Sequence, residues 1–235
     1  MELTRDLSTF TVLAIGFALG LQHAVEADHL AAVSTIVSEK KSLLTASIIG
    51  GFWGLGHTIS LFIVGAVVIF LKVQISESVE ARLEAVVGGM LVLLGLNALR
   101  KLFTAEKIHV HVHAHEHGTR EHLHIHSHGS EPETSHHRFS PRSVLIGMVH
   151  GLAGSAALML LILPTIPSPA LAMLYILIFG IGSIGGMMVM SFLIGLPFHF
   201  TADKFALLNK GIRLCAGVFS LGLGAFIVYE QLLSV

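Results

Sequence analysis

Residues 10–37, FTVLAIGFALGLQHAVEADHLAAVSTIV, form an apolar run that is long enough to cross a lipid bilayer as one helix. Four ionisable residues interrupt this run: His23, Glu26, Asp28 and His29. An Asp side chain at the centre of a bilayer costs about 2.5–3.5 kcal/mol on insertion scales, so such a group usually faces the protein interior or a polar path. We therefore predict that this segment is a transmembrane helix whose buried side chains bind a divalent transition-metal cation.

The composition of the whole chain is that of a membrane protein. Of its 235 residues, 53% are hydrophobic and 12% are charged. The balance of 14 Lys and Arg residues against 15 Asp and Glu residues excludes a basic nucleic-acid-binding surface. The single cysteine, Cys215, excludes an internal disulfide, and its apolar neighbours in the sequence favour a small buried residue.

Six apolar runs are long enough to cross a bilayer. The sequence therefore predicts an all-α polytopic membrane protein with six transmembrane helices, at residues 10–37, 43–71, 83–103, 143–163, 170–198 and 211–233.

The two halves of the chain resemble each other. A shift of 127 positions places residues 23–25 on residues 150–152, and a shift of 126 places residues 54–56 on residues 180–182. Chance similarity between glycine-rich apolar segments is the alternative, although the offset is nearly constant. We predict two inverted three-helix repeats with a site near the membrane midplane, where the repeats meet.

The segment between the predicted repeats, residues 104–142, is polar and rich in histidine. In an extended chain alternate residues project to the same side, so neighbouring imidazoles can share one metal ion. We interpret the segment as a flexible cytoplasmic loop that buffers metal ions. It lies between the first repeat, residues 1–103, and the second repeat, residues 143–235. The alternative is a solvated linker that transport does not need. Its histidines form two alternating runs and a pair: His109, His111, His113, His115 and His117; His122, His124, His126 and His128; His136 and His137.

Basic residues predict the orientation of the chain. In a six-span arrangement most of them fall on the side of the histidine-rich loop: Lys40, Lys41, Arg100, Lys101, Lys107, Arg120, Arg138, Arg142, Lys204, Lys210 and Arg213. Because short basic loops favour the cytoplasm, we expect the loop inside and both termini outside, in a plasma (inner) membrane. The first residues lack the basic region of a secretory signal, so we expect the first span to be retained.

The first span provides most of the candidate ligands. On a regular helix His23, Glu26 and His29 share one flank, whereas Asp28 points almost the opposite way. Either the helix is distorted, so that Asp28 joins the ligands, or Asp28 orients a histidine of a neighbouring span.

His57 and His150 are the remaining candidate ligands. The repeats would bring both to the depth of His23, although each could instead be a helix-packing histidine beside small residues such as Gly54 and Gly56. Combined imidazole and carboxylate ligands suit nickel, cobalt and zinc, whereas copper sites are typically rich in sulfur.

Two motifs on consecutive predicted spans resemble those of the nickel/cobalt transporter superfamily. His23-x-x-x-x-Asp28-His29 is similar to its His-Ala-x-Asp-Ala-Asp-His signature on an early transmembrane helix. Residues 51–58, GFWGLGHT, resemble its second motif, which ends in Leu-Gly-His-Ser/Thr. Residues 150–155 are similar to those of six-span relatives described as urease-accessory or nickel-permease-like membrane proteins.

The resemblance implies that Ni²⁺ or Co²⁺ is the transported substrate. It also implies that His23, Asp28, His29 and His57 line the metal path. Glu26 replaces the usual Asp of the signature, which leaves the selectivity for nickel over cobalt open.

We therefore predict transmembrane transport of nickel and/or cobalt, with uptake as the first hypothesis and efflux or zinc transport as the alternatives. A zinc transporter of the cation-diffusion type would share the six spans and the loop, but a cytosolic carboxy-terminal domain is not expected here. Neither the Gly-x-x-x-x-Gly-Lys-Ser/Thr motif of ATP-binding proteins nor the His-Glu-x-x-His motif of metalloproteases occurs, so we expect neither ATP use nor enzyme activity. The expected partners are the lipid bilayer and cytosolic nickel chaperones or nickel-enzyme maturation proteins, and no prosthetic group is expected.

Overall fold

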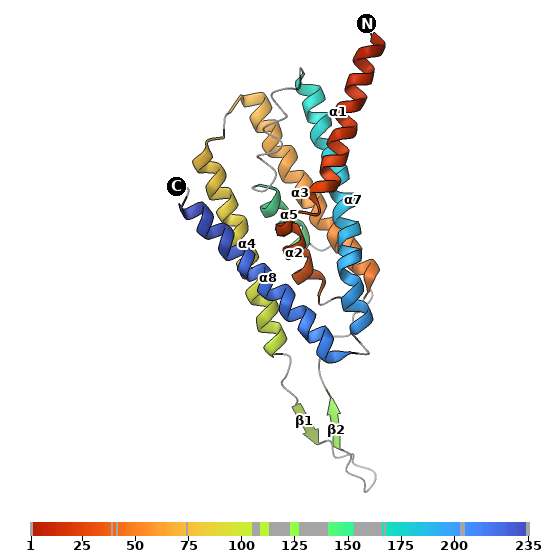
Figure 1. Ribbon diagram of the computed structural model, residues 1–235, viewed down its shortest axis with the longest axis vertical. Helices are drawn as coiled ribbons and strands as arrows, with labels where there is room; N and C mark the ends of the chain where they lie inside the picture. Colours follow the sequence, from red (N-terminus) through yellow and green to blue (C-terminus); the bar gives the residue numbers. More distant parts are fainter. Residues whose placement is uncertain are drawn as a thin grey trace.

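The computed structural model describes residues 2–38, 40, 42–73, 75–104, 109–112, 123–126, 141–152, 166, 168–202 and 205–233. Its main body is all-helical, as the sequence predicts (Figure 1). The helices are α1 (Glu2–His23), α2 (Ala27–Val37), α3 (Leu43–Leu71), α4 (Glu77–Thr104), α5 (Pro141–Gly151), α7 (Pro169–Thr201) and α8 (Ala206–Leu233).

Four of these helices, α3, α4, α7 and α8, are long and apolar enough to cross a membrane. The first predicted span is instead a pair of helices, Thr9–His23 and Ala27–Val37, bent by 54° at a short break. The fourth predicted span begins with α5, whose 11 residues are too few to cross a bilayer alone. Residues 153–163 of that span lie outside the described residues. The chain is thus a multi-pass membrane protein. That it crosses the membrane six times stays a prediction.

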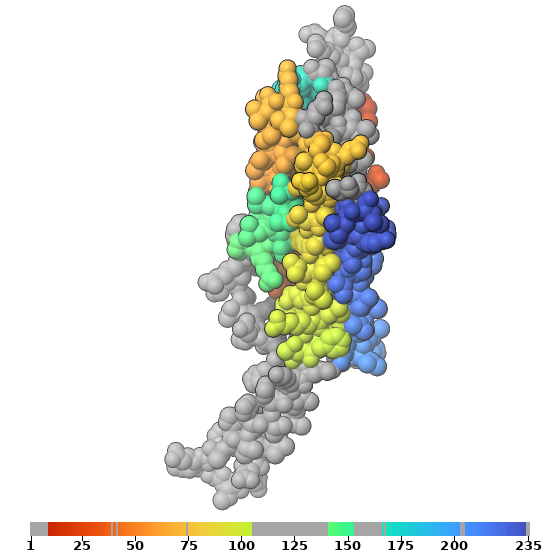
Figure 2. Space-filling model, turned by 90° about the vertical axis from the view of Figure 1, so that its left-hand side faces the viewer, coloured from red at the N-terminus to blue at the C-terminus, as the bar shows by residue number. Residues whose placement is uncertain are grey.

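The long helices pack in pairs. α3 packs against α5 and α7, α1 packs against α7, and α4 packs against α8. α2 contacts α3, α4, α7 and α8, so it lies among the long helices (Figure 1). Figure 2 shows α4 between α5 on one side and α8 on the other.

Glycines let the helix backbones approach closely. A Cβ atom on Gly147 of α5 would overlap the carbonyl oxygen of Trp53 on α3. A Cβ atom on Gly20 of α1 would overlap the carbonyl oxygen of Phe179 on α7. Close contact at small residues is the usual basis of helix association in a membrane. These contacts hold α5 against α3 and α1 against α7, and they set the distances between side chains at the centre of the bundle.

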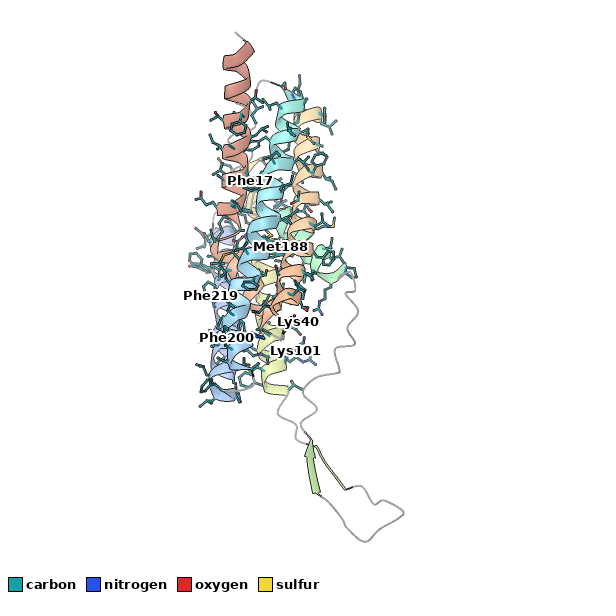
Figure 3. The ribbon with its side chains drawn as sticks, turned by 90° about the vertical axis from the view of Figure 1, so that its right-hand side faces the viewer. Phe17, Lys40, Lys101, Met188, Phe200 and Phe219 are labelled. Carbon is teal, nitrogen blue, oxygen red and sulfur yellow. The ribbon has the colours of Figure 1, made fainter. Side chains whose placement is uncertain are left out.

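Large apolar side chains cover the outer surface of the helices. Phe17, Phe200 and Phe219 are 41%, 66% and 48% exposed, and they point away from the bundle (Figure 3). Such broad apolar exposure is typical of a surface that lipid covers. Cys215 is exposed too, so the prediction of a buried cysteine is wrong; the hydrophobic residues around it in the sequence belong to a helix with an apolar outer surface.

A small antiparallel sheet lies within the histidine-rich segment, where the sequence predicted only a flexible loop. β1 (His109–Val112) pairs with β2 (Leu123–His126), and the register places His109 opposite His126 and His111 opposite His124. Val, Ile and Leu alternate with the histidines, and β-branched residues favour strands. The other histidines of the segment lie outside the described residues.

Candidate metal centre

The helix that carries most of the candidate ligands is broken among them. α1 ends at His23 and α2 begins at Ala27, while Glu26, the residue that precedes α2, has an extended backbone with φ −66° and ψ 151°. The Glu26 carbonyl oxygen accepts the hydrogen bond from the Leu30 amide at 3.0 Å, which starts the new helix. The sequence left two alternatives for Asp28: a distorted helix, or a bond to a histidine of a neighbouring span. The first of these, a distorted helix, is present.

Four histidines from four different helices meet at this break. His23 of α1, His29 of α2, His57 of α3 and His150 of α5 are each at most 1% exposed. The ring of His29 is central: its centroid lies 4.3 Å from that of His23, 5.4 Å from that of His57 and 4.2 Å from that of His150. We call these four residues and Asp28 the histidine–aspartate cluster.

Asp28 connects two of these histidines. Its Oδ1 accepts a hydrogen bond from the backbone N–H of His29 at 2.8 Å and lies 3.0 Å from Nδ1 of the same residue. Its Oδ2 lies 2.9 Å from Nε2 of His150. A carboxylate in this position orients the imidazoles and selects which ring nitrogen carries the proton. The second alternative left by the sequence, a bond from Asp28 to a histidine of another helix, is therefore present as well.

Two groups of potential ligand atoms share His29. One group is His23, His29 and His57, and the other is Asp28, His29 and His150; within each group the ligand atoms lie within 4.8 Å of one another. Nε2 of His23 and Nε2 of His29 are buried and have no hydrogen-bond partner among the described residues. Buried polar atoms are nearly always paired in proteins. Unpaired imidazole nitrogens that converge in a dry site have the chemistry to bind a cation.

Glu26 lies at the margin of the cluster. Its Oε1 is 2.9 Å from Nδ1 of His23, but the two groups are not aligned as a hydrogen bond. The side chain is 38% exposed and belongs to neither ligand group. The structure thus brings five of the six predicted ligands into the two groups and places Glu26 beside them.

The sequence analysis missed Trp53. Its ring centroid lies 5.3 Å from that of His29 and 5.4 Å from that of His150, and the residue is 1% exposed. Residues four apart on a helix lie on the same face, so the position of Trp53 one turn before His57 could have indicated this contact. On the other side of the cluster, the ring of Phe179 lies 5.6 Å from that of His23. These two aromatic rings pack against the histidines of the cluster.

Comparison with known proteins identifies relatives over nearly the whole chain. A protein-family profile described as a high-affinity nickel-transport protein, NicO, matches residues 9–229. The chain is 39% identical over 225 residues to a urease accessory protein, UreH, of Bacillus sp. (strain TB-90), which covers 96% of this chain and 93% of that protein. No solved structure matches.

More distant relatives occur in a plant. The chloroplast proteins FOR GROWTH AND FERTILITY 2 and 1 of Arabidopsis thaliana are each 24% identical to this chain, over 218 and 215 residues. These matches cover 92% and 91% of this chain, but 55% and 57% of the plant proteins.

The family match extends from the first span almost to the end of α8. It confirms the resemblance that the two motifs indicated, and with it a transporter rather than an enzyme, with Ni²⁺ as the transported substrate. The chain belongs to the NicO family of high-affinity nickel-transport proteins.

Proposed function

We propose that Ni²⁺ crosses the membrane through the histidine–aspartate cluster, moving between the two ligand groups that share His29. The observation that carries this proposal is the burial of four imidazoles around one carboxylate, with ligand atoms within 4.8 Å in each group. An ion held first by His23, His29 and His57 would need to exchange few ligands to reach Asp28 and His150. Adjacent sites of this kind let an ion leave each one readily, as conduction requires.

The ligand chemistry suits the substrate. Imidazole nitrogens and a carboxylate oxygen bind borderline divalent ions, so Co²⁺ is the second substrate that we propose, and Zn²⁺ the nearest competitor. Glu26, partly exposed beside His23, would attract the incoming cation and replace part of its water shell.

We also propose that residues 1–103 and 143–235 are inverted repeats that rock about the cluster. The helix contacts support this. One kind of contact, a glycine of one half packed on the backbone of an aromatic residue of the other half, occurs twice, and the two occurrences are at corresponding positions of the two halves. Gly20 packs on the backbone of Phe179, and Gly147 packs on the backbone of Trp53. A shift of 127 positions relates the two glycines, and a shift of 126 relates the two aromatic residues.

The same exchange relates aromatic contacts within the cluster. Phe179 lies against His23, with 5.6 Å between the ring centroids, and Trp53 lies against His150, with 5.4 Å between them. His23 and His150 are again 127 positions apart. On this proposal the metal path lies near the midplane, and α5 together with residues 153–163 forms the fourth of the six spans.

For orientation and delivery we propose uptake into the cytoplasm, with both termini outside and the histidine-rich loop inside. The loop would hold incoming nickel by pairs such as His109 with His126 and His111 with His124, which the strand register places opposite each other. The name of the urease accessory relative supports delivery of the ion to nickel chaperones or to maturation proteins of a nickel enzyme.

The test is accumulation of radioactive nickel in cells that express the wild type, H23A or H199A, with cobalt and zinc as competitors. His199 is an exposed histidine near the end of α7, so H199A removes the same side chain outside the cluster. We expect the wild type and H199A to raise cellular nickel and H23A to abolish the increase. A decrease with the wild type would mean efflux. Equal accumulation by the wild type and H23A would contradict transport through the cluster.

A further inference from the structure

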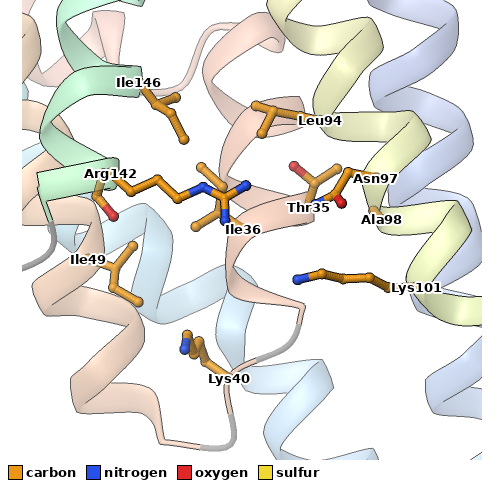
Figure 4. A pocket seen from close by; sticks show the side chains of 11 residues that line it. Thr35, Ile36, Lys40, Ile49, Leu94, Asn97, Ala98, Lys101, Arg142 and Ile146 are labelled. Atoms are coloured by element: carbon orange, nitrogen blue, oxygen red, sulfur yellow. The ribbon is translucent and has the colours of Figure 1, made fainter. Parts of the chain in front are cut away.

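A cavity of about 190 Å³ lies between α2, α3, α4 and α5 and is lined by basic side chains from three separate segments (Figure 4). Lys40 follows α2, Lys101 lies near the end of α4, and Arg142 lies in the first turn of α5. None of the described residues that line the cavity is acidic. Three basic side chains thus border one open cavity of a cation transporter.

The cavity lies along the helices that carry the metal ligands. Arg142 is eight positions before His150 on α5, and Ile49, which also lines the cavity, is eight positions before His57 on α3. At a rise of 1.5 Å per residue, eight positions span about 12 Å. Figure 3 shows Lys40 and Lys101 toward the same end of the bundle. The cavity therefore lies between the histidine–aspartate cluster and this end of the protein.

An empty cavity with this lining would oppose the passage of nickel. Like charges repel each other, and a divalent cation that leaves the cluster along α3 and α5 would pass all three basic groups. An anion of matching shape would remove this barrier. The guanidinium of Arg142 can donate two parallel hydrogen bonds to an oxyanion, and the lysines add point charges.

We propose that this cavity binds a phosphate-type oxyanion, either the headgroup of an anionic phospholipid or free phosphate. Basic pockets between transmembrane helices on the cytoplasmic side are suited to anionic headgroups. Ile36, Ile49 and Ile146 also line the cavity, and these apolar side chains suit the glycerol and acyl part of a lipid. Amide groups at the start of α5, beside Arg142, favour an anion as well. The bound anion neutralises the cavity below the metal cluster.

The test measures thermal unfolding of the full-length protein, purified in a neutral detergent without nickel. Inorganic phosphate is added in one arm, with chloride at equal ionic strength as its reference. Phosphatidylglycerol is added in the other arm, with phosphatidylcholine as its reference. We expect saturating anion to raise the Tm by about 5 °C or more, and the double variant K40Q/R142Q to lose this rise.

R100Q is the matched control, because Arg100 precedes Lys101 on α4, is exposed and does not line the cavity; it should keep the full rise. If K40Q/R142Q does not fold, R142K replaces it and should bind more weakly, since lysine lacks the planar fork of arginine. A rise with phosphatidylglycerol alone identifies a lipid headgroup, and a rise with phosphate identifies the free ion. No rise with either anion, or an equal loss in R100Q, overturns the proposal. H23A should keep the rise, so this result is independent of the proposed path for nickel.

Discussion

Replacement of Asp28 by Asn tests the proposal that the cluster binds nickel. The substitution keeps the volume of the side chain and removes its negative charge. In the wild type, Oδ1 lies 3.0 Å from Nδ1 of His29 and Oδ2 lies 2.9 Å from Nε2 of His150. An asparagine can accept a hydrogen bond from one of these rings, but it presents an N–H₂ group to the other. One imidazole therefore changes its protonated nitrogen or turns away.

The expected loss follows from these contacts. Removal of a carboxylate that orients a metal-binding histidine typically weakens metal affinity about 10- to 100-fold. Asp28 contacts two histidines of the cluster, so we expect the upper part of that range, about 2–3 kcal/mol of binding free energy.

Isothermal titration of nickel into the purified protein measures the effect of D28N, and thermal unfolding without metal verifies that the variant is folded. E26Q is the matched control, because Glu26 is a neighbouring carboxylate that lies outside both ligand groups. We expect E26Q to weaken binding less than D28N. Wild-type affinity in D28N, or a larger loss in E26Q, would refute the role assigned to Asp28.

Three further predictions concern packing, pH and the loop. G147A should lower the Tm and the nickel affinity, because its Cβ would overlap the carbonyl oxygen of Trp53 and overpacking costs about 1–3 kcal/mol; G89A is the control, since a Cβ at Gly89 meets nothing within 4 Å. Nickel affinity, measured by titration, should fall as the pH is lowered, because a protonated imidazole cannot bind a cation; an affinity that rises in acid would argue against histidine ligands. Deletion of residues 109–137 should lower the number of nickel ions bound in detergent more than the rate of uptake, and complete loss of uptake would contradict a buffering role.

Much of the fold could be predicted because hydropathy is a local property. The helices α3, α4, α7 and α8 each follow from an apolar run of sufficient length. The histidines and carboxylates of the first span could be singled out for the same reason, since ionisable groups are costly in lipid whatever the rest of the chain does. The small sheet was missed because residues 109–126 are mostly polar, and four-residue strands gain stability only by pairing with each other.

The amino-acid sequence by itself determined that this is a helical membrane protein with buried imidazole and carboxylate groups, and the pattern of those groups indicated its family. Only the tertiary structure decided that Asp28 bonds to His150, that Trp53 covers the cluster, and that Lys40 and Arg142 line one cavity. These contacts join helices far apart in the chain. Their geometry depends on how closely the backbones approach at small residues such as Gly147, and no local pattern contains that distance.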